Sequence, residues 1–201
     1  MSDRYDPRGR VVTGERPSPP ARFEPVSDGD LRIAEVPFLT QVNLRLDPGG
    51  PAAGDIGRAL DVPLPAEPGT YGSADVDVLW LGPDEWLIVG EPGRERDLET
   101  RLRAAAGTGH VAVTDVSAQR TTLLVAGPKA RDLLAHGCAL DLHPRVFGPG
   151  RCAQTMLARA QVLLVARDGD EFLVFVRSSF AGYLAEWLLD AAAEYVSGQP
   201  G

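Results

Sequence analysis

The feature that most constrains the fold of this chain is an internal repeat. The sequence ALD at 59–61 recurs at 139–141, and DEWLIV at 84–89 is echoed by DEFLVF at 170–175. Both echoes occur in the same order, and their offsets differ by only a few residues. We therefore predict two similar βα modules, the second of which carries a short insertion.

The chain divides into four expected segments. Residues 1–25 contain five prolines, many arginines and few apolar residues, so they cannot bury enough surface to offset the entropy of ordering. We expect a mobile tail at 1–25, which could also order on a partner. A first α+β module at 26–109, a second at 110–196 and a short tail at 197–201 complete the organisation.

Periodicity places helices and strands in each module. In the first, the alternation that ends at Leu46 predicts a strand, and the apolar runs at 76–81 and 86–89 predict a hairpin. Helical spacing predicts two helices, at 52–60 and 94–106. In the second, strands are expected at 121–125, 153–158, 161–166 and 172–176. The last helix has apolar residues from 180 to 191 in an i, i+3, i+4, i+7 pattern. Ser178 or Ser179 is placed as its N-cap. The fold class is therefore α+β with antiparallel sheets.

Charge and apolar content exclude several classes of function. The net charge of −8 opposes binding to nucleic acid, which requires clustered positive charge, and also opposes adsorption to anionic lipid. No apolar run approaches the ~18 residues of a membrane-spanning helix. The N-terminus has no apolar leader core, and the two cysteines, Cys138 and Cys152, fit buried thiols of a reducing compartment. We expect a cytoplasmic protein.

No catalytic motif emerges from the spacing of reactive residues. The three histidines form no metal-ligand spacing, and phosphate-binding or nucleophile-elbow glycine patterns are absent from the sequence. Carboxylates cluster at Asp168, Asp170 and Glu171, where a hairpin turn is the simpler interpretation and acid–base catalysis the alternative. Asp115 and Ser117 suit side-chain to backbone bonds in a turn.

The candidate site residues belong to an interaction surface. His143, Arg145 and Phe147 lie in a loop bounded by proline and glycine, and loop arginine and aromatic side chains are frequent anchors of protein interfaces. Arg120 is a further candidate, facing either solvent or a carboxylate. An ordinary packed loop is the alternative interpretation. Trp80 and Trp86, near one hairpin, fill a core or form a stacking platform for a ligand.

Several segments resemble the gamma-subunit family of heterotetrameric sarcosine oxidases. They are LWLGPDEWLIVG, TDVSAQRTTLLVAGPKARDLL, GCALDLHPRVFGPGRCAQT and VRSSFAGYLAEWLLDA, and with their spacing they cover roughly 28–194. The chain is more distantly similar to the folate-binding aminomethyltransferases of the glycine cleavage system. The shared pattern is a D-x-S segment that leads into a strand and a G-P-x-A helix.

The resemblance implies two ferredoxin-like modules, like the folate-binding domain of an aminomethyltransferase. It also implies a complex of alpha, beta, gamma and delta subunits that oxidises sarcosine to glycine. Hydrogen peroxide is formed, and the one-carbon unit leaves as formaldehyde or passes to tetrahydrofolate. The resemblance places FAD, FMN, NAD, zinc and tetrahydrofolate in the partner subunits, and no cofactor, metal or catalytic residue in this chain.

The chain departs from the aminomethyltransferases in one segment. Their folate chemistry uses a carboxylate ahead of the hairpin strands, and the corresponding stretch here, ARAQV at 158–162, has no Asp or Glu. The chain is also about half as long as such an enzyme. Our hypothesis is a non-catalytic gamma subunit that stabilises the flavoprotein subunits. The alternatives are a small folate-binding or aminomethyl-transfer-like protein of one-carbon metabolism and a free-standing regulatory adaptor.

Overall fold

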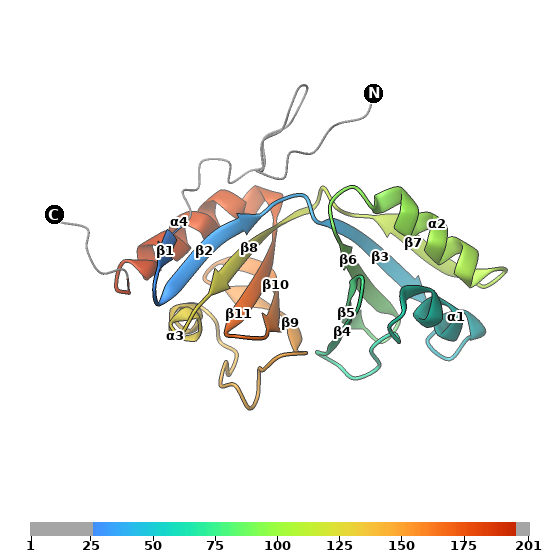
Figure 1. The fold of residues 1–201 in the computed structure, drawn as a ribbon, viewed down its shortest axis with the longest axis horizontal. Helices are drawn as coiled ribbons and strands as arrows, with labels where there is room; N and C mark the ends of the chain where they lie inside the picture. The colour runs from blue at the N-terminus through green and yellow to red at the C-terminus, as the bar shows by residue number, and fades with distance from the viewer. Residues whose placement is uncertain (1–25, 196–201) are drawn as a thin grey trace, which may run out of the picture. The chain divides into compact units, whose positions relative to one another are not determined.

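The computed structural model describes residues 26–195, which form two compact units (Figure 1). The central unit comprises residues 38–118, and the terminal unit combines residues 26–37 with residues 119–195. This division differs from the expected modules at 26–109 and 110–196, because strand pairing groups residues that are distant in the sequence. The expected tails at 1–25 and 197–201 lie outside the described residues.

The central unit is a βαββαβ arrangement with one additional short strand. Its sheet has the order β4-β5-β6-β3-β7, and every neighbouring pair is antiparallel. Without β4 this is the ferredoxin-like order. The elements are β3 (Thr40–Leu46), α1 (Pro51–Leu60), β4 (Tyr71–Ser73), β5 (Asp77–Gly82), β6 (Glu85–Gly90), α2 (Glu95–Ala106) and β7 (Val111–Asp115).

The terminal unit repeats this arrangement, but its last strand comes from the beginning of the chain. Its antiparallel sheet has the order β1-β2-β8-β11-β10-β9, so β2 lies beside β8 as β7 lies beside β3. The elements are β1 (Val26–Asp28), β2 (Leu31–Val36), β8 (Arg120–Ala126), α3 (Ala130–Ala135), β9 (Cys152–Leu157), β10 (Ala160–Arg167), β11 (Glu171–Arg177), η1 (Ser178–Phe180) and α4 (Ala181–Ala192).

The two sheets explain the sequence repeat. The Asp-Glu pair at 84–85 lies at the tip of the β5–β6 hairpin, and the pair at 170–171 lies at the tip of the corresponding β10–β11 hairpin. The ALD triplet at 59–61 forms the end and C-cap of α1, and the triplet at 139–141 follows α3, the first helix of its unit. The strand that was expected only in the second module, now β9, has a three-residue counterpart in β4. The predicted fold class of two ferredoxin-like modules is confirmed.

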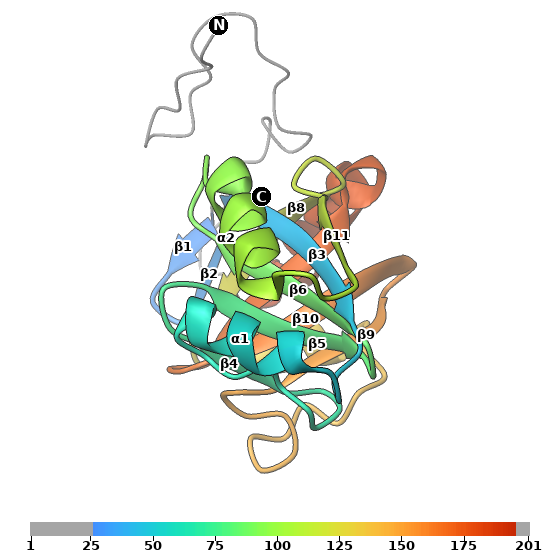
Figure 2. The ribbon, with the colours of Figure 1, turned by 90° about the vertical axis from the view of Figure 1, so that its right-hand side faces the viewer.

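Each unit has its own apolar core. Figure 2 shows α1 and α2 on the same side of the central sheet, where their buried residues pack with β3, β5, β6 and β7. In the terminal unit α3 and α4 contribute to one cluster with the sheet. The α4 helix forms where predicted, with Leu184 and Leu188 fully buried. Its expected N-cap is wrong: residues 178–180 form a 3₁₀ turn, and Phe180 precedes the helix without a side-chain cap.

Among the helices described, none is long and apolar enough to cross a lipid bilayer.

Candidate functional site

The loop between α3 and β9 carries three of the four residues predicted for the interaction surface: His143, Arg145 and Phe147. We call residues 141–148 the anchored loop. Its two apolar ends, Leu142 and Phe147, are 7% and 6% exposed and belong to the core cluster under the sheet. Burying two side chains of this size contributes about 1.5–3 kcal/mol each. The loop is therefore fixed at both ends by its own packing.

Arg131 on α3 ties the two ends of the anchored loop together. One guanidinium nitrogen, Nη1, donates to the carbonyl oxygens of Leu142 at 2.6 Å and Phe147 at 2.9 Å. Nε donates to Asp170 Oδ1 at 2.8 Å, and the guanidinium lies 4.8 Å from the centre of the Phe172 ring. The fixed fork of arginine suits such a multiple contact. Arg131 was not among the residues predicted from the sequence.

Hydrogen bonds within the loop fix the segment between these ends. The backbone N–H groups of Val146 and Phe147 donate to the His143 carbonyl oxygen at 2.8 and 2.9 Å. The His143 N–H donates to Asp141 Oδ1 at 2.9 Å, and the Arg145 N–H donates to His143 Nδ1 at 3.2 Å. These bonds pair several backbone groups of the loop with partners inside the loop itself.

A close backbone approach also restricts this loop. A Cβ atom at Gly148 would lie 2.6 Å from the Pro144 carbonyl oxygen, so only glycine fits at this position. The tip between the two buried ends is exposed at His143, Pro144, Arg145 and Val146. Val146 is 54% exposed, so the tip presents this aliphatic side chain to solvent beside Pro144.

The structure thus brings only part of the predicted interface together. His143 and Arg145 share the exposed tip, whereas Phe147 points into the core and offers almost no surface. Half-buried Arg120 begins β8, opposite Arg177 at the end of β11. The anchored loop is tied to the other end of these strands through Asp170, and a seven-residue strand spans ~20 Å. Arg120 is therefore separate from the loop.

The carboxylate clusters take structural positions. Asp170 has a left-handed backbone (φ 55°) in the β10–β11 turn and pairs with Arg131, while Glu171 lies 3.5 Å from Arg32. Ser117 donates to Asp115 through both its N–H (2.9 Å) and its hydroxyl (2.6 Å), as predicted for a turn. Within residues 26–195, no three His, Cys, Asp or Glu side chains are grouped to hold a metal ion.

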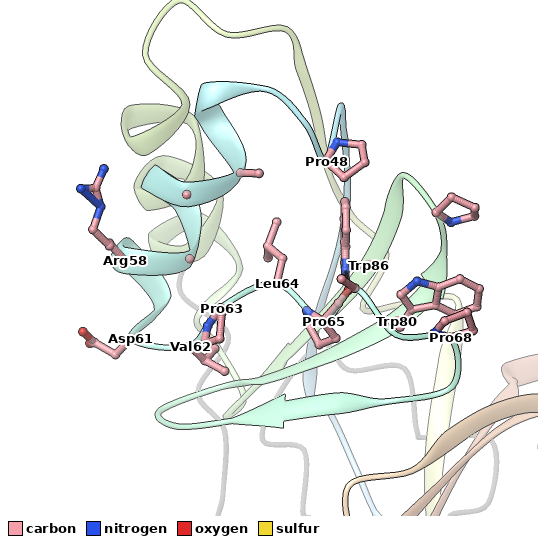
Figure 3. Close-up of a pocket in the computed structure, with 15 residues that line it drawn as sticks. Pro48, Arg58, Asp61, Val62, Pro63, Leu64, Pro65, Pro68, Trp80 and Trp86 are labelled. Carbon is pink, nitrogen blue, oxygen red and sulfur yellow. Dashed lines mark hydrogen bonds between the residues drawn. The ribbon is translucent and has the colours of Figure 1, made fainter.

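A second surface feature, which sequence reasoning missed, is an apolar groove on the central unit (Figure 3). Its cavity volume is about 810 Å³. Trp86 is 2% exposed, and its indole N–H donates to the Pro65 carbonyl oxygen at 2.9 Å. Trp80, its cross-strand partner, is half-buried and lines the groove. Trp86 therefore fills the core, whereas part of the Trp80 side chain is exposed in the groove.

Comparison with known proteins identifies relatives that match most of the chain. The model of the "sarcosine oxidase, gamma subunit family" matches residues 45–194. Curated sarcosine oxidase gamma subunits from Corynebacterium sp. (strain P-1) and Arthrobacter sp. are each 37% identical over 171 residues, which cover 84% of this chain and 83% of the relative.

Two solved structures extend the comparison. A chain of the heterotetrameric sarcosine oxidase from Corynebacterium sp. U-96, in complex with pyrrole 2-carboxylate, superposes with a TM-score of 0.82 and 35% identity. The match covers 92% of this chain and 99% of that chain. The aminomethyltransferase T of Bartonella henselae superposes with a TM-score of 0.60 at 17% identity, covering 78% of this chain and 45% of the other. This second likeness concerns the fold alone.

Proposed function

Because this chain belongs to the sarcosine oxidase gamma subunit family, we propose that it is a non-catalytic subunit of a heterotetrameric sarcosine oxidase. Its role is to stabilise the larger flavoprotein subunits by covering part of their surface. The observation that carries the proposal is the match to a chain of a heterotetrameric sarcosine oxidase over 99% of that chain's length. This chain is therefore similar to a whole subunit of such an assembly.

The proposed partners are the alpha, beta and delta subunits, which would hold FAD, FMN, NAD, zinc and tetrahydrofolate. The assembly would oxidise sarcosine to glycine in the cytoplasm. Within it, the chemistry belongs to the partners, and this chain contributes surface. The Asp170 and Glu171 side chains of the β10–β11 hairpin support this division, because both are engaged in ion pairs with arginines.

The tip of the anchored loop is the proposed docking surface. His143, Arg145 and Val146 form a basic and apolar tip whose backbone is hydrogen-bonded within the loop itself. A preorganised loop loses little conformational entropy on association, so more of its contact energy appears as affinity. A stable hetero-complex buries ~2,000 Å² or more in total, so the tip would be one part of a larger interface. Phe147 supports the loop from the core, and Arg120 is tested separately.

The experiment is co-expression of the tagged chain with candidate flavoprotein subunits from its own genome, followed by purification through the tag. We expect a yellow complex that oxidises sarcosine and a colourless, inert chain when it is expressed alone. A monomer that ignores these partners but gains thermal stability with tetrahydrofolate would refute the subunit proposal in favour of a folate-binding protein.

The docking surface is tested in the same assay by Arg145→Glu combined with Val146→Asp. The matched control is Arg96→Glu, which reverses the charge of an exposed arginine on α2. The double variant is expected to lose at least 90% of the captured flavoprotein, and the control to retain it. If both variants retain the partners equally, the loop tip is not the docking surface. An Arg120→Glu variant then shows whether the start of β8 contributes.

A further inference from the structure

The groove of the central unit has walls with a preset backbone. Prolines line it from three separate segments: Pro48 ahead of α1, Pro65 and Pro68 after α1, and Pro83 in the β5–β6 turn. Because the proline ring fixes the backbone φ angle, these walls lose little freedom when a ligand binds. The cavity volume of about 810 Å³ falls within the ~300–1,000 Å³ range of binding sites.

A glycine within α1 keeps one side of the groove open. Gly54 lies inside the helix, where glycine lowers helix stability relative to alanine. Among the described residues, no other segment has an atom within 4 Å of a Cβ atom built at Gly54, so packing does not require glycine there. At Gly57, by contrast, a Cβ atom would lie 3.3 Å from the Pro63 Cα atom. Since Gly54 lines the groove, a larger side chain at this position would take up groove space.

The groove surface favours an apolar ligand. Figure 3 shows Trp80 and Trp86 toward one side of the groove, with Arg58 and Asp61 toward the other. The Trp86 indole N–H already donates to the Pro65 carbonyl oxygen at 2.9 Å, and Arg58 is held in an ion pair within α1. A sugar or nucleotide would give up its hydration for few new hydrogen bonds, which is unfavourable.

The segments that line the groove also carry a negative charge. Residues 47–68 and 80–86 contain six carboxylates and one arginine. Arginines from outside these segments lie 3.6 and 3.2 Å from two of the carboxylates and offset part of this charge. One of the two, Asp61, keeps a side chain that is 78% exposed. A ligand with a cation near Asp61 is therefore favoured over a neutral or anionic one.

A proline-rich peptide that contains an arginine has this combination of properties. Such a peptide favours a polyproline II helix, which has three residues per turn, rises ~3.1 Å per residue and keeps its backbone solvated. It therefore needs few hydrogen bonds from the protein. Aromatic-lined grooves bind helices of this kind because little conformational entropy is lost. An arginine adds the cation that the carboxylates favour.

We propose that this groove binds a proline-rich, arginine-containing segment of another protein. The prolines of that segment lie against Trp80, and its arginine lies near Asp61. Six residues extend ~19 Å in polyproline II form. Every groove residue belongs to the central unit, and the inference does not depend on the proposed subunit function.

The test titrates the full chain with a synthetic peptide of five prolines followed by one arginine, blocked at both ends. The indole N–H signals in a ¹⁵N spectrum report Trp80, Trp86 and Trp187 separately, and the peptide is expected to shift the Trp80 signal most. Replacing the arginine of the peptide by glutamate should weaken binding at least threefold. Asp61→Asn should reduce this difference, and asparagine tolerates the left-handed backbone of residue 61 (φ 57°).

A variant that fills the groove tests its location. Gly54→Leu is expected to weaken the peptide at least 10-fold. The matched control is Gly182→Leu on α4, a helical glycine that does not line the groove and whose Cβ atom would also have no other described segment within 4 Å. Leucine favours a helix more than glycine does, so neither substitution should lower the urea midpoint. A loss of binding in Gly54→Leu then reports the groove and not unfolding.

Several results would overturn the proposal. They are an unchanged Trp80 signal at millimolar peptide, equal affinity for the arginine and glutamate peptides, and equal affinity of Gly54→Leu and Gly182→Leu. Self-association that Gly54→Leu abolishes and the peptide does not compete with would assign the groove to a second copy of the chain. Binding of free indole at Trp80 that the peptide cannot displace would assign it to a small molecule. Either assignment contradicts the proposal.

Discussion

Replacing Arg131 by methionine should destabilise the terminal unit and release the anchored loop. Methionine replaces the aliphatic part of the side chain but removes every donor. Two hydrogen bonds from the guanidinium to the carbonyl oxygens of Leu142 and Phe147 are lost, and each contributes about 1 kcal/mol in a partly buried place. The contact with the Phe172 ring adds about 0.5–1 kcal/mol.

The ion pair with Asp170 adds less, because the Asp170 side chain is 46% exposed and pairs of this kind contribute about 0.5 kcal/mol. The whole loss is therefore about 3 kcal/mol in the free energy of unfolding. Urea unfolding followed by circular dichroism measures it, since a stability change moves the midpoint at a constant slope. A loss below about 1 kcal/mol would show that the loop holds without its guanidinium, and would refute the anchoring argument.

The control is Arg32→Met. It removes an ion pair that is longer than the Arg131–Asp170 pair and whose arginine is more exposed. Arg32 on β2 lies 3.5 Å from Glu171, the residue after Asp170 in the β10–β11 hairpin, and its side chain is 54% exposed. The substitution should therefore lower the free energy of unfolding by less than about 0.5 kcal/mol. A second readout separates loop geometry from stability. At a temperature where both variants are folded, Arg131→Met should capture at least 10-fold less flavoprotein than Arg32→Met, although the exposed tip is identical in the two.

Three further substitutions test the packing of the terminal unit in the same urea assay. Gly137→Ala would place a Cβ atom 2.7 Å from the Trp187 ring and 2.9 Å from the Ala158 nitrogen, and should cost about 2 kcal/mol. Leu188→Ala removes a side chain that is 0% exposed and should cost about 3 kcal/mol. Ala158→Gly should instead stabilise by about 0.5–1 kcal/mol, because Ala158 has a φ of 51° that costs a non-glycine residue about 1–2 kcal/mol. A change of the opposite sign at any of the three would contradict the packing described.

Local sequence patterns determined most of the elements. The alternating and continuous apolar runs gave β5, β6, β10 and β11, and the helical spacing of Leu184 and Leu188 gave α4, because each pattern is repeated over several residues. The internal repeat predicted the equivalence of the two hairpins. The segments at 31–36 and 111–115, which become β2 and β7, were not predicted. They are short, and their patterns mix polar and apolar residues.

The division into units required the tertiary structure. Strand β2 pairs with β8, although about 90 residues separate Ile33 from its partner Val125. A strand's partner depends on which edge of a folded sheet is open, and no local pattern encodes that. The N-terminal strand therefore completes the second module, in the place that β7 takes in the first.

Tertiary packing also decided which single side chains belong to the candidate surfaces. The sequence identified the loop through its prolines, glycines and His143 and Arg145, because these residue types favour turns and exposure. It could not show that Phe147 is buried and Val146 exposed, since that depends on the space left by α3 and the sheet. The anchoring by Arg131, and the groove beside Trp80, likewise arise only when segments distant in sequence pack together. Residue type and spacing thus determined the local structure, and packing between distant segments decided which side chains remain at the surface.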